Sequence, residues 1–260
     1  MFNLFESPKN PNRKKGEGYK VSEFSQSAGD DFARNNILAS RLYKTLKPIQ
    51  PFACTRSTYT RLQVALYKAV RNDQIHDLGS LKLGYGDVSP LRGFRFSLKT
   101  SLGRFFVNKP VAYYNEDENK VEIRSSLKSI LKFESIHERL AKLVIKKYCI
   151  LIQLDEPNAI TVMSSKDLDL KQGHSLEDRS VFFPLKDNIN VLVLCLSTVR
   201  CWLKTPDEAE QFLSNDTTLM TAEVIDVILI RDGKCMFFPE KEANKMLPPI
   251  QPSDDELDWE

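Results

Sequence analysis

The chain has 260 residues, of which 42% are hydrophobic and 28% are charged, a composition that can build a buried core. No uninterrupted apolar run of roughly 18 residues occurs, which argues against a membrane-spanning helix. The basic residues near the start precede no long apolar stretch, so we expect a cytoplasmic protein without a secretory signal or a membrane partner.

Charge is distributed unevenly along the chain. Residues 1–110 contain 19 Lys and Arg against 8 Asp and Glu, whereas residues 111–260 contain 18 against 27. The two parts therefore carry +11 and −9, which sum to the net charge of +2. This asymmetry indicates an anionic partner for the front part, or attraction between the two parts or between two copies.

The chain is predicted to begin with a basic arm over residues 1–29, which lacks apolar periodicity. A first helix is predicted over Asp30–Lys47, because Asp30 can cap it and Pro48 stops it. A second is predicted over Thr58–Asn72 from its apolar stripe. The short connection between them predicts an antiparallel helical hairpin over residues 30–77.

Residues 78–247 are predicted to form a mostly antiparallel β-sandwich-like domain. Phe94, Phe96 and Leu98 alternate as in a strand, and residues 111–124 are typical of a hairpin. Periodicity over residues 126–147 is only partly helical. Later strands are predicted at Lys147–Leu154, Ala159–Met163, Ser180–Pro184, Asn190–Cys195, Val199–Leu203, Glu223–Ile230 and Cys235–Phe238, with one helical turn at Asp207–Phe212. The predicted fold class is α+β, with the helical hairpin packed on the β-sandwich-like domain.

Residues 248–260 are predicted to be an acidic tail after a proline-rich stem. Leu257 and Trp259 stand among its acidic residues, so the tail could dock on a basic groove of another protein or of this chain. The alternative is a terminus that only increases solubility.

Reactive side chains do not gather into a recognisable catalytic, cofactor-binding or metal-binding motif. The pair Gly84 and Gly86 lacks the third glycine and the helix of a dinucleotide site. His76, His137 and His174 are far apart and lie in polar stretches, where exposed imidazoles are expected. The cysteines are scattered singly, which is unlike a zinc site or a disulfide framework, and Cys195 in an apolar run is predicted to be a core residue.

Basic residues fall on one face of each predicted helix. They could neutralise phosphates or acidic groups together with two lysines of the arm. The alternative is that they are the solvated outer faces of amphipathic helices. The candidate residues for an anionic partner are Lys14, Lys15, Arg34, Arg41, Lys44, Arg61, Lys68 and Arg71.

Eight stretches, in order, carry a resemblance to a known family: Gly18–Tyr19, Phe32–Asn36, Leu42–Pro48, Tyr59–Leu62, Ala69–Asp73 and Leu91–Phe96, with weaker matches at Val191–Cys195 and Val224–Ile228. Together they resemble an uncharacterised family of Bacteroidota proteins of similar length. The resemblance implies a helical hairpin followed by a β-sandwich-like region, and it implies no known activity. The chain departs from the family pattern in lacking a glycine-rich opening strand.

The sequence therefore predicts a non-enzymatic structural or protein-interaction protein, which self-associates through its basic front and acidic back or binds another protein. The alternative is a nucleic-acid-binding protein that uses the basic helices. We expect no cofactor and no small-molecule substrate.

Overall fold

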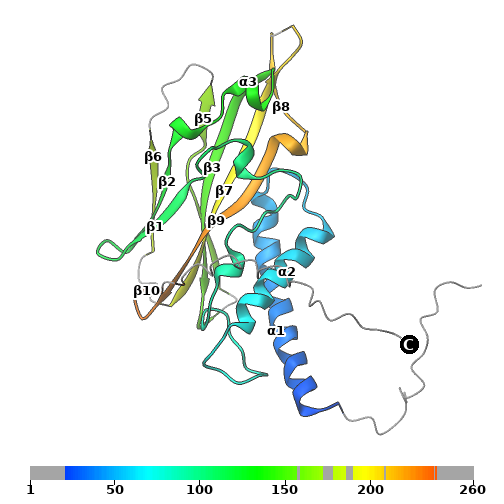
Figure 1. Ribbon diagram of the computed structural model, residues 1–260, viewed down its shortest axis with the longest axis vertical. Coiled ribbons are helices and arrows are strands. Elements are labelled where there is room, and N and C mark those ends of the chain that lie inside the picture. The colour runs from blue at the N-terminus through cyan, green and yellow to red at the C-terminus, as the bar shows by residue number, and fades with distance from the viewer. Residues whose placement is uncertain are drawn as a thin grey trace, which may run out of the picture.

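A computed structural model describes residues 21–156, 159–171, 178–185, 190–207, 209–236 and 238. The fold is α+β as predicted, with N-terminal helices packed on antiparallel sheets (Figure 1). Most of the predicted arm and the whole acidic tail lie outside the described residues. The helical segments are α1 (Glu23–Leu46), η1 (Lys47–Ile49), α2 (Arg56–Arg71), η2 (Ser89–Leu91), η3 (Leu102–Arg104), η4 (Leu127–Ser129), α3 (Phe133–Ile136) and η5 (Thr217–Leu219).

The strands form two sheets, and every pairing among the described strands is antiparallel. The 7-stranded sheet has the order β10-β9-β7-β3-β4, with β5 also paired to β3 and β8 to β7. The 3-stranded sheet has the order β1-β2-β6. The strands are β1 (Val111–Asn115), β2 (Lys120–Ser125), β3 (Leu140–Gln153), β4 (Ile160–Ser164), β5 (Leu168–Lys171), β6 (Arg179–Pro184), β7 (Val191–Lys204), β8 (Gln211–Leu213), β9 (Met220–Arg231) and β10 (Lys234–Met236).

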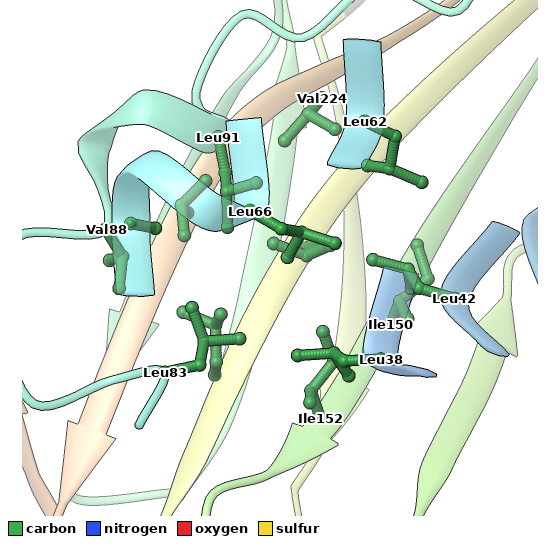
Figure 2. Packing of buried hydrophobic residues seen from close by; sticks show 14 of the residues in the cluster. Leu38, Leu42, Leu62, Leu66, Leu83, Val88, Leu91, Ile150, Ile152 and Val224 are labelled. Carbon is green, nitrogen blue, oxygen red and sulfur yellow. The ribbon is translucent and has the colours of Figure 1, made fainter. Parts of the chain in front are cut away.

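The large sheet is covered on both faces. Side chains alternate along β3 and β7, so that Ile150 and Leu194 face α1 and α2, and Figure 2 shows leucines of both helices among the side chains of the sheet. On the opposite face, Leu151 packs against the small sheet. Further along the same face, Cys201 packs against residues of the 102–136 segment. The molecule therefore has three layers, and the sandwich is formed by one large and one small sheet.

Helix α1 begins seven residues before the predicted start at Asp30. Ser22 caps it, because its hydroxyl oxygen accepts a hydrogen bond from the Ser25 backbone N–H at 3.2 Å. Residues 23–29, which we assigned to the arm, are therefore helical. Asp30 is exposed within the helix and takes no part in capping it.

The two helices form the predicted antiparallel hairpin. Thr55 caps α2, and the rings of Phe32 and Tyr67 meet edge to face with centroids 5.7 Å apart. Tyr43 and Tyr59 do the same at 5.4 Å. Phe32, near the start of α1, meets Tyr67 near the end of α2, and Tyr43, near the end of α1, meets Tyr59 near the start of α2. The two helices therefore run in opposite directions.

The predicted strand at Phe94–Leu98 is wrong. Only Arg95 forms a β-bridge, to Glu223 of β9. Phe96 is buried, but Leu98 is 61% exposed instead of sharing its face. The carbonyl of Phe96 accepts a hydrogen bond from the Thr58 hydroxyl of α2 at 3.1 Å instead of continuing a ladder with β9.

Other predicted boundaries also change. The two strands expected at 190–195 and 199–203 are one continuous strand, β7. The helical turn expected at 207–212 is wrong, since residues 211–213 form β8. The unassigned 126–147 segment contains η4, α3 and the first half of β3. Cys195 is fully buried, as predicted.

A row of polar side chains crosses the centre of the face opposite the helices. Lys147 of β3 pairs in register with Ser197 of β7, which pairs with Glu223 of β9. The Lys147 ammonium nitrogen lies 3.0 Å from the Ser197 hydroxyl oxygen. Glu223 is ion-paired with Lys109 and accepts a hydrogen bond from the Leu102 backbone N–H at 3.0 Å. This row separates the part of the face covered by the small sheet from the part covered by the 102–136 segment.

Candidate functional site

A groove of about 370 Å³ lies between the outer face of α2 and the segment that follows η2. We call it the α2 groove. Three of its lining residues are cationic and none is acidic, and most of the others are apolar. The lining consists of Thr60, Arg61, Val64, Ala65 and Lys68 of α2 with Pro90, Gly93, Phe94, Arg95 and Leu98.

Arg61 connects the two sides of the groove. Its guanidinium donates hydrogen bonds to the carbonyls of Arg95 at 2.6 Å and Phe96 at 3.1 Å, and it lies 5.4 Å from the centre of the Phe94 ring. Burial, and then the positive charge of Arg95, lowers the pKa of Arg61 from its ordinary value. Arg61 therefore holds the segment in place, and it places uncompensated positive charge beside Arg95.

The floor of the α2 groove is fixed by backbone hydrogen bonds to β9. The N–H of Gly93 donates to the Val224 carbonyl at 2.9 Å, and the N–H of Phe96 donates to the Ala222 carbonyl at 3.0 Å. The segment is therefore held between α2 on one side and the large sheet on the other. Such a preformed surface binds with little loss of conformational entropy.

The outer rim of the groove combines charge with apolar surface. Val64 is 49% exposed and Leu98 is 61% exposed. Neither Lys68 nor Arg95 is ion-paired within the part of the chain that the structure describes. The groove can therefore accept apolar side chains between negatively charged neighbours.

The structure brings only two of the predicted basic residues into one site, Arg61 and Lys68. Arg34 is paired with Asp31 and donates to the Gly79 carbonyl, beside a different part of the surface. Lys14 and Lys15, like the tail residues Leu257 and Trp259, lie outside the described residues. The remaining three basic residues are exposed on the helices, at Arg41 and Lys44 of α1 and at Arg71 of α2, the last over the Tyr67 ring.

Sequence reasoning missed the second wall of the groove. Phe94, Arg95 and Leu98 were assigned to a strand, in which Arg95 would point away from its neighbours. The available signal was the glycine at position 93, whose φ of +73° ends η2 with a turn that continues into the extended segment.

The two histidines that the structure describes, His76 and His137, are partly buried rather than fully exposed. The Nδ1 atom of His76 lies 2.8 Å from a carboxylate oxygen of Asp73, and its ring meets Tyr85 edge to face. Asp73 also accepts backbone N–H groups, including that of Lys82 at 2.8 Å, so the pair closes a turn. His137 accepts a hydrogen bond from the Arg139 N–H. Among the described residues no Ser or Cys is hydrogen-bonded to either ring, and His174 lies outside them.

Burial disfavours the thiolate form of the three buried cysteines, Cys149, Cys195 and Cys201. Burial raises the pKa of Cys149 and of Cys201 to about 12, and that of Cys195 well above its ordinary value. All five cysteines are free. Across the described ranges, no group of three His, Cys, Asp or Glu is placed to hold a metal ion.

Within those same ranges, no helix is long and apolar enough to cross a membrane. Comparisons of the chain with models of known protein families, with curated proteins and with solved structures return no match. The resemblance to the Bacteroidota family therefore stays a prediction.

Proposed function

We propose that this chain is a non-enzymatic protein-interaction protein of the cytoplasm, and that the α2 groove binds an acidic segment of a partner protein. The observation that carries the proposal is the lining of the groove, with three cations, no acidic residue and exposed aliphatic side chains. An acidic segment interrupted by leucine or aromatic residues matches this lining in both charge and polarity.

Nucleic acid fits the groove less well. Binding a phosphate backbone needs cations repeated along a track, and sequence-tolerant binding of single strands needs exposed aromatic faces. The cations of α1 and α2 border different surfaces, because Arg34 contacts Gly79 while Arg61 contacts Arg95 and Phe96. Binding of nucleic acid therefore stays the alternative hypothesis.

Some of the opposite charges of the front and back parts are paired with each other within one chain, which is an alternative to pairing between two copies. Lys109 pairs with Glu223, and Arg92 lies 2.9 Å from a carboxylate oxygen of Asp226. Both contacts join the basic front to the acidic back. A partner with its own acidic segment therefore accounts better for the exposed cations of the α2 groove than a second copy does.

Fluorescence anisotropy of the full-length chain tests the proposal. The probe is a dye-labelled synthetic peptide of glutamates interrupted by leucine and phenylalanine. We expect saturable binding that weakens with added salt, and an affinity loss of about tenfold, or 1.4 kcal/mol, for Lys68→Glu combined with Arg95→Glu.

The matched control is Arg41→Glu combined with Lys44→Glu, which makes the same change of charge on α1 and should leave binding almost unchanged. Equal losses in both double variants would show non-specific attraction and contradict the proposal. Tighter binding of a single-stranded oligonucleotide than of the peptide would favour the nucleic-acid alternative instead.

A further inference from the structure

A polar pocket lies between the connection of α1 to α2 and the strands β4, β3 and β7 of the large sheet. It has a volume of about 360 Å³, within the range of roughly 300–1,000 Å³ that is usual for small-molecule sites. We call it the β3–β7 pocket. It is lined by Pro48, Ile49, Gln50 and Pro51 of the connection, Lys146 and Tyr148 of β3, Val162 and Ser164 of β4, and Thr198 and Arg200 of β7.

The register of the large sheet brings the polar side chains of this pocket together. Tyr148 pairs with Ser164 of β4, and Lys146 pairs with Thr198 of β7. Paired residues, and residues two apart on one strand, lie on the same face of a sheet, so Arg200 joins them. The polar groups therefore stand on three adjacent strands, whose pairing holds them in place before any ligand binds.

The charge of the pocket is positive. Among the described residues of its lining, Lys146 and Arg200 are cationic and none is acidic. Both cations contact one carboxylate outside the lining, that of Asp167, whose side chain is 41% exposed between β4 and β5. Lys146 Nζ lies 3.1 Å from Asp167 Oδ1, and the Arg200 guanidinium lies 3.3 Å from Oδ2. An oxyanion therefore already bridges the two cations, and one positive charge of the three groups stays uncompensated.

Hydroxyl groups extend the set of hydrogen-bond donors around the two cations. Tyr148 is 8% exposed, and its pKa is raised, chiefly by burial, so its hydroxyl keeps its proton at neutral pH. Ser164, its partner on β4, is exposed. The buried Thr198 hydroxyl donates to the Lys146 carbonyl at 3.4 Å, which fixes the backbone next to the ammonium group. The pocket therefore offers neutral and charged donors together, as a ligand group with several anionic oxygens requires.

We propose that the β3–β7 pocket binds the phosphate group of a small molecule, in competition with the carboxylate of Asp167 for Lys146 and Arg200. A phosphate group has three terminal oxygens and a charge of about −1.5 to −2 at neutral pH, so it engages both cations and the hydroxyls at once, whereas a carboxylate has two oxygens. The rest of the ligand packs on the apolar side chains of the lining, which are Pro48, Ile49, Pro51 and Val162. The inference assigns a bound ligand and no reaction, and it is independent of the α2 groove and of the function proposed for it.

Isothermal titration calorimetry of the full-length chain with phenyl phosphate tests this inference. We expect a single saturable site, and weaker binding of benzoate, which presents a carboxylate on the same ring. Arg200→Gln should weaken the binding of phenyl phosphate by about tenfold, because it removes a charged donor. Ser164→Ala, at an exposed position where the fold tolerates the change, should weaken it several-fold.

Asp167→Asn should act in the opposite direction, because it removes the carboxylate that competes for the two cations. Phenyl phosphate should bind this variant about threefold to tenfold more tightly than the parent. The matched control is Asp169→Asn, which makes the same change of charge at a residue that pairs with Lys142 at 3.0 Å, and neither of these two residues lines the pocket. Its affinity should stay close to that of the parent. Equal gains in the two variants, benzoate binding as tight as that of phenyl phosphate, or the absence of saturable binding to the folded parent would each overturn the inference.

Discussion

Lys147 is the residue whose environment is least favourable for a charge. Its side chain is 4% exposed at the centre of the large sheet, and its hydrogen-bond partner is the neutral hydroxyl of Ser197. The carboxylate in the same row, that of Glu223, is paired with Lys109 instead. Burial therefore lowers the pKa of Lys147 from 10.5 to about 7.

This shift predicts how stability depends on pH. Between about pH 7 and 10.5 the unfolded chain binds a proton at Lys147 that the folded chain does not, so the free energy of unfolding should rise with pH across this window. The full rise corresponds to on the order of 5 kcal/mol. Lys147→Met should abolish this contribution, as measured by urea unfolding at a series of pH values. A methionine variant that keeps the parent's slope would contradict the assignment.

Two glycines should respond to alanine in opposite directions. A Cβ at Gly86 would lie 1.7 Å from the Asn72 carbonyl oxygen, so Gly86→Ala should destabilise the fold by about 2 kcal/mol or more. Gly29 lies within α1 with no atom near its Cβ position, so Gly29→Ala should stabilise it by up to about 1 kcal/mol. Thermal unfolding measures both, and a neutral Gly86→Ala would contradict the close approach of the two segments.

At the scale of elements, α2 and β9 hold the segment around Arg95 from two sides. Arg61→Gln should leave two carbonyl groups without their charged donor and destabilise the fold by about 1–3 kcal/mol. Lys68→Gln is the matched control on the same helix face, and because Lys68 is exposed its effect should stay within about 0.5 kcal/mol. Urea unfolding at one pH compares the two. Equal effects would mean that Arg61 is a solvated surface residue.

The helices and most strands could be predicted from the sequence because their apolar residues repeat with the period of the element. An example is the leucine stripe of α1, in which Leu38 and Leu42 are buried. The apolar periodicity did not predict strand positions whose buried side chains are polar. Ser197 and Thr198 lie between the two strands predicted at Asn190–Cys195 and Val199–Leu203, yet both are buried within β7, and Ser197 is hydrogen-bonded to Lys147 on the neighbouring strand. A linear sequence does not show which strands become neighbours.

The candidate site was predictable only in part, for the same reason. Arg61 and Lys68 share a helix face, so their proximity follows from helical geometry. Arg95 and Leu98 reach the groove through a turn at Gly93 and tertiary contacts with β9. The pocket lined by Asn35 is assembled from four separate segments, namely α1, Val70 of α2, residues 80–85 and residues 154–155, and no spacing in the sequence indicates it.

At the scale of the whole molecule, the basic front is not an independent unit. The largest hydrophobic cluster contains residues of α1 and α2 together with β3, β7 and β9. Residues 1–77 expressed alone should therefore expose both leucine stripes and show little helix by circular dichroism. A cooperatively folded monomer of that fragment would contradict the shared core.

The measurement that tests the proposed function most directly is methyl NMR of the full-length chain during titration with the glutamate- and leucine-containing peptide. We predict saturable shifts of the Val64 and Leu98 methyl signals, which lie in the α2 groove, and unchanged signals from Ile37 at the separate pocket lined by Asn35. Saturation without a shift at Val64 and Leu98, or no binding at all, would contradict the account.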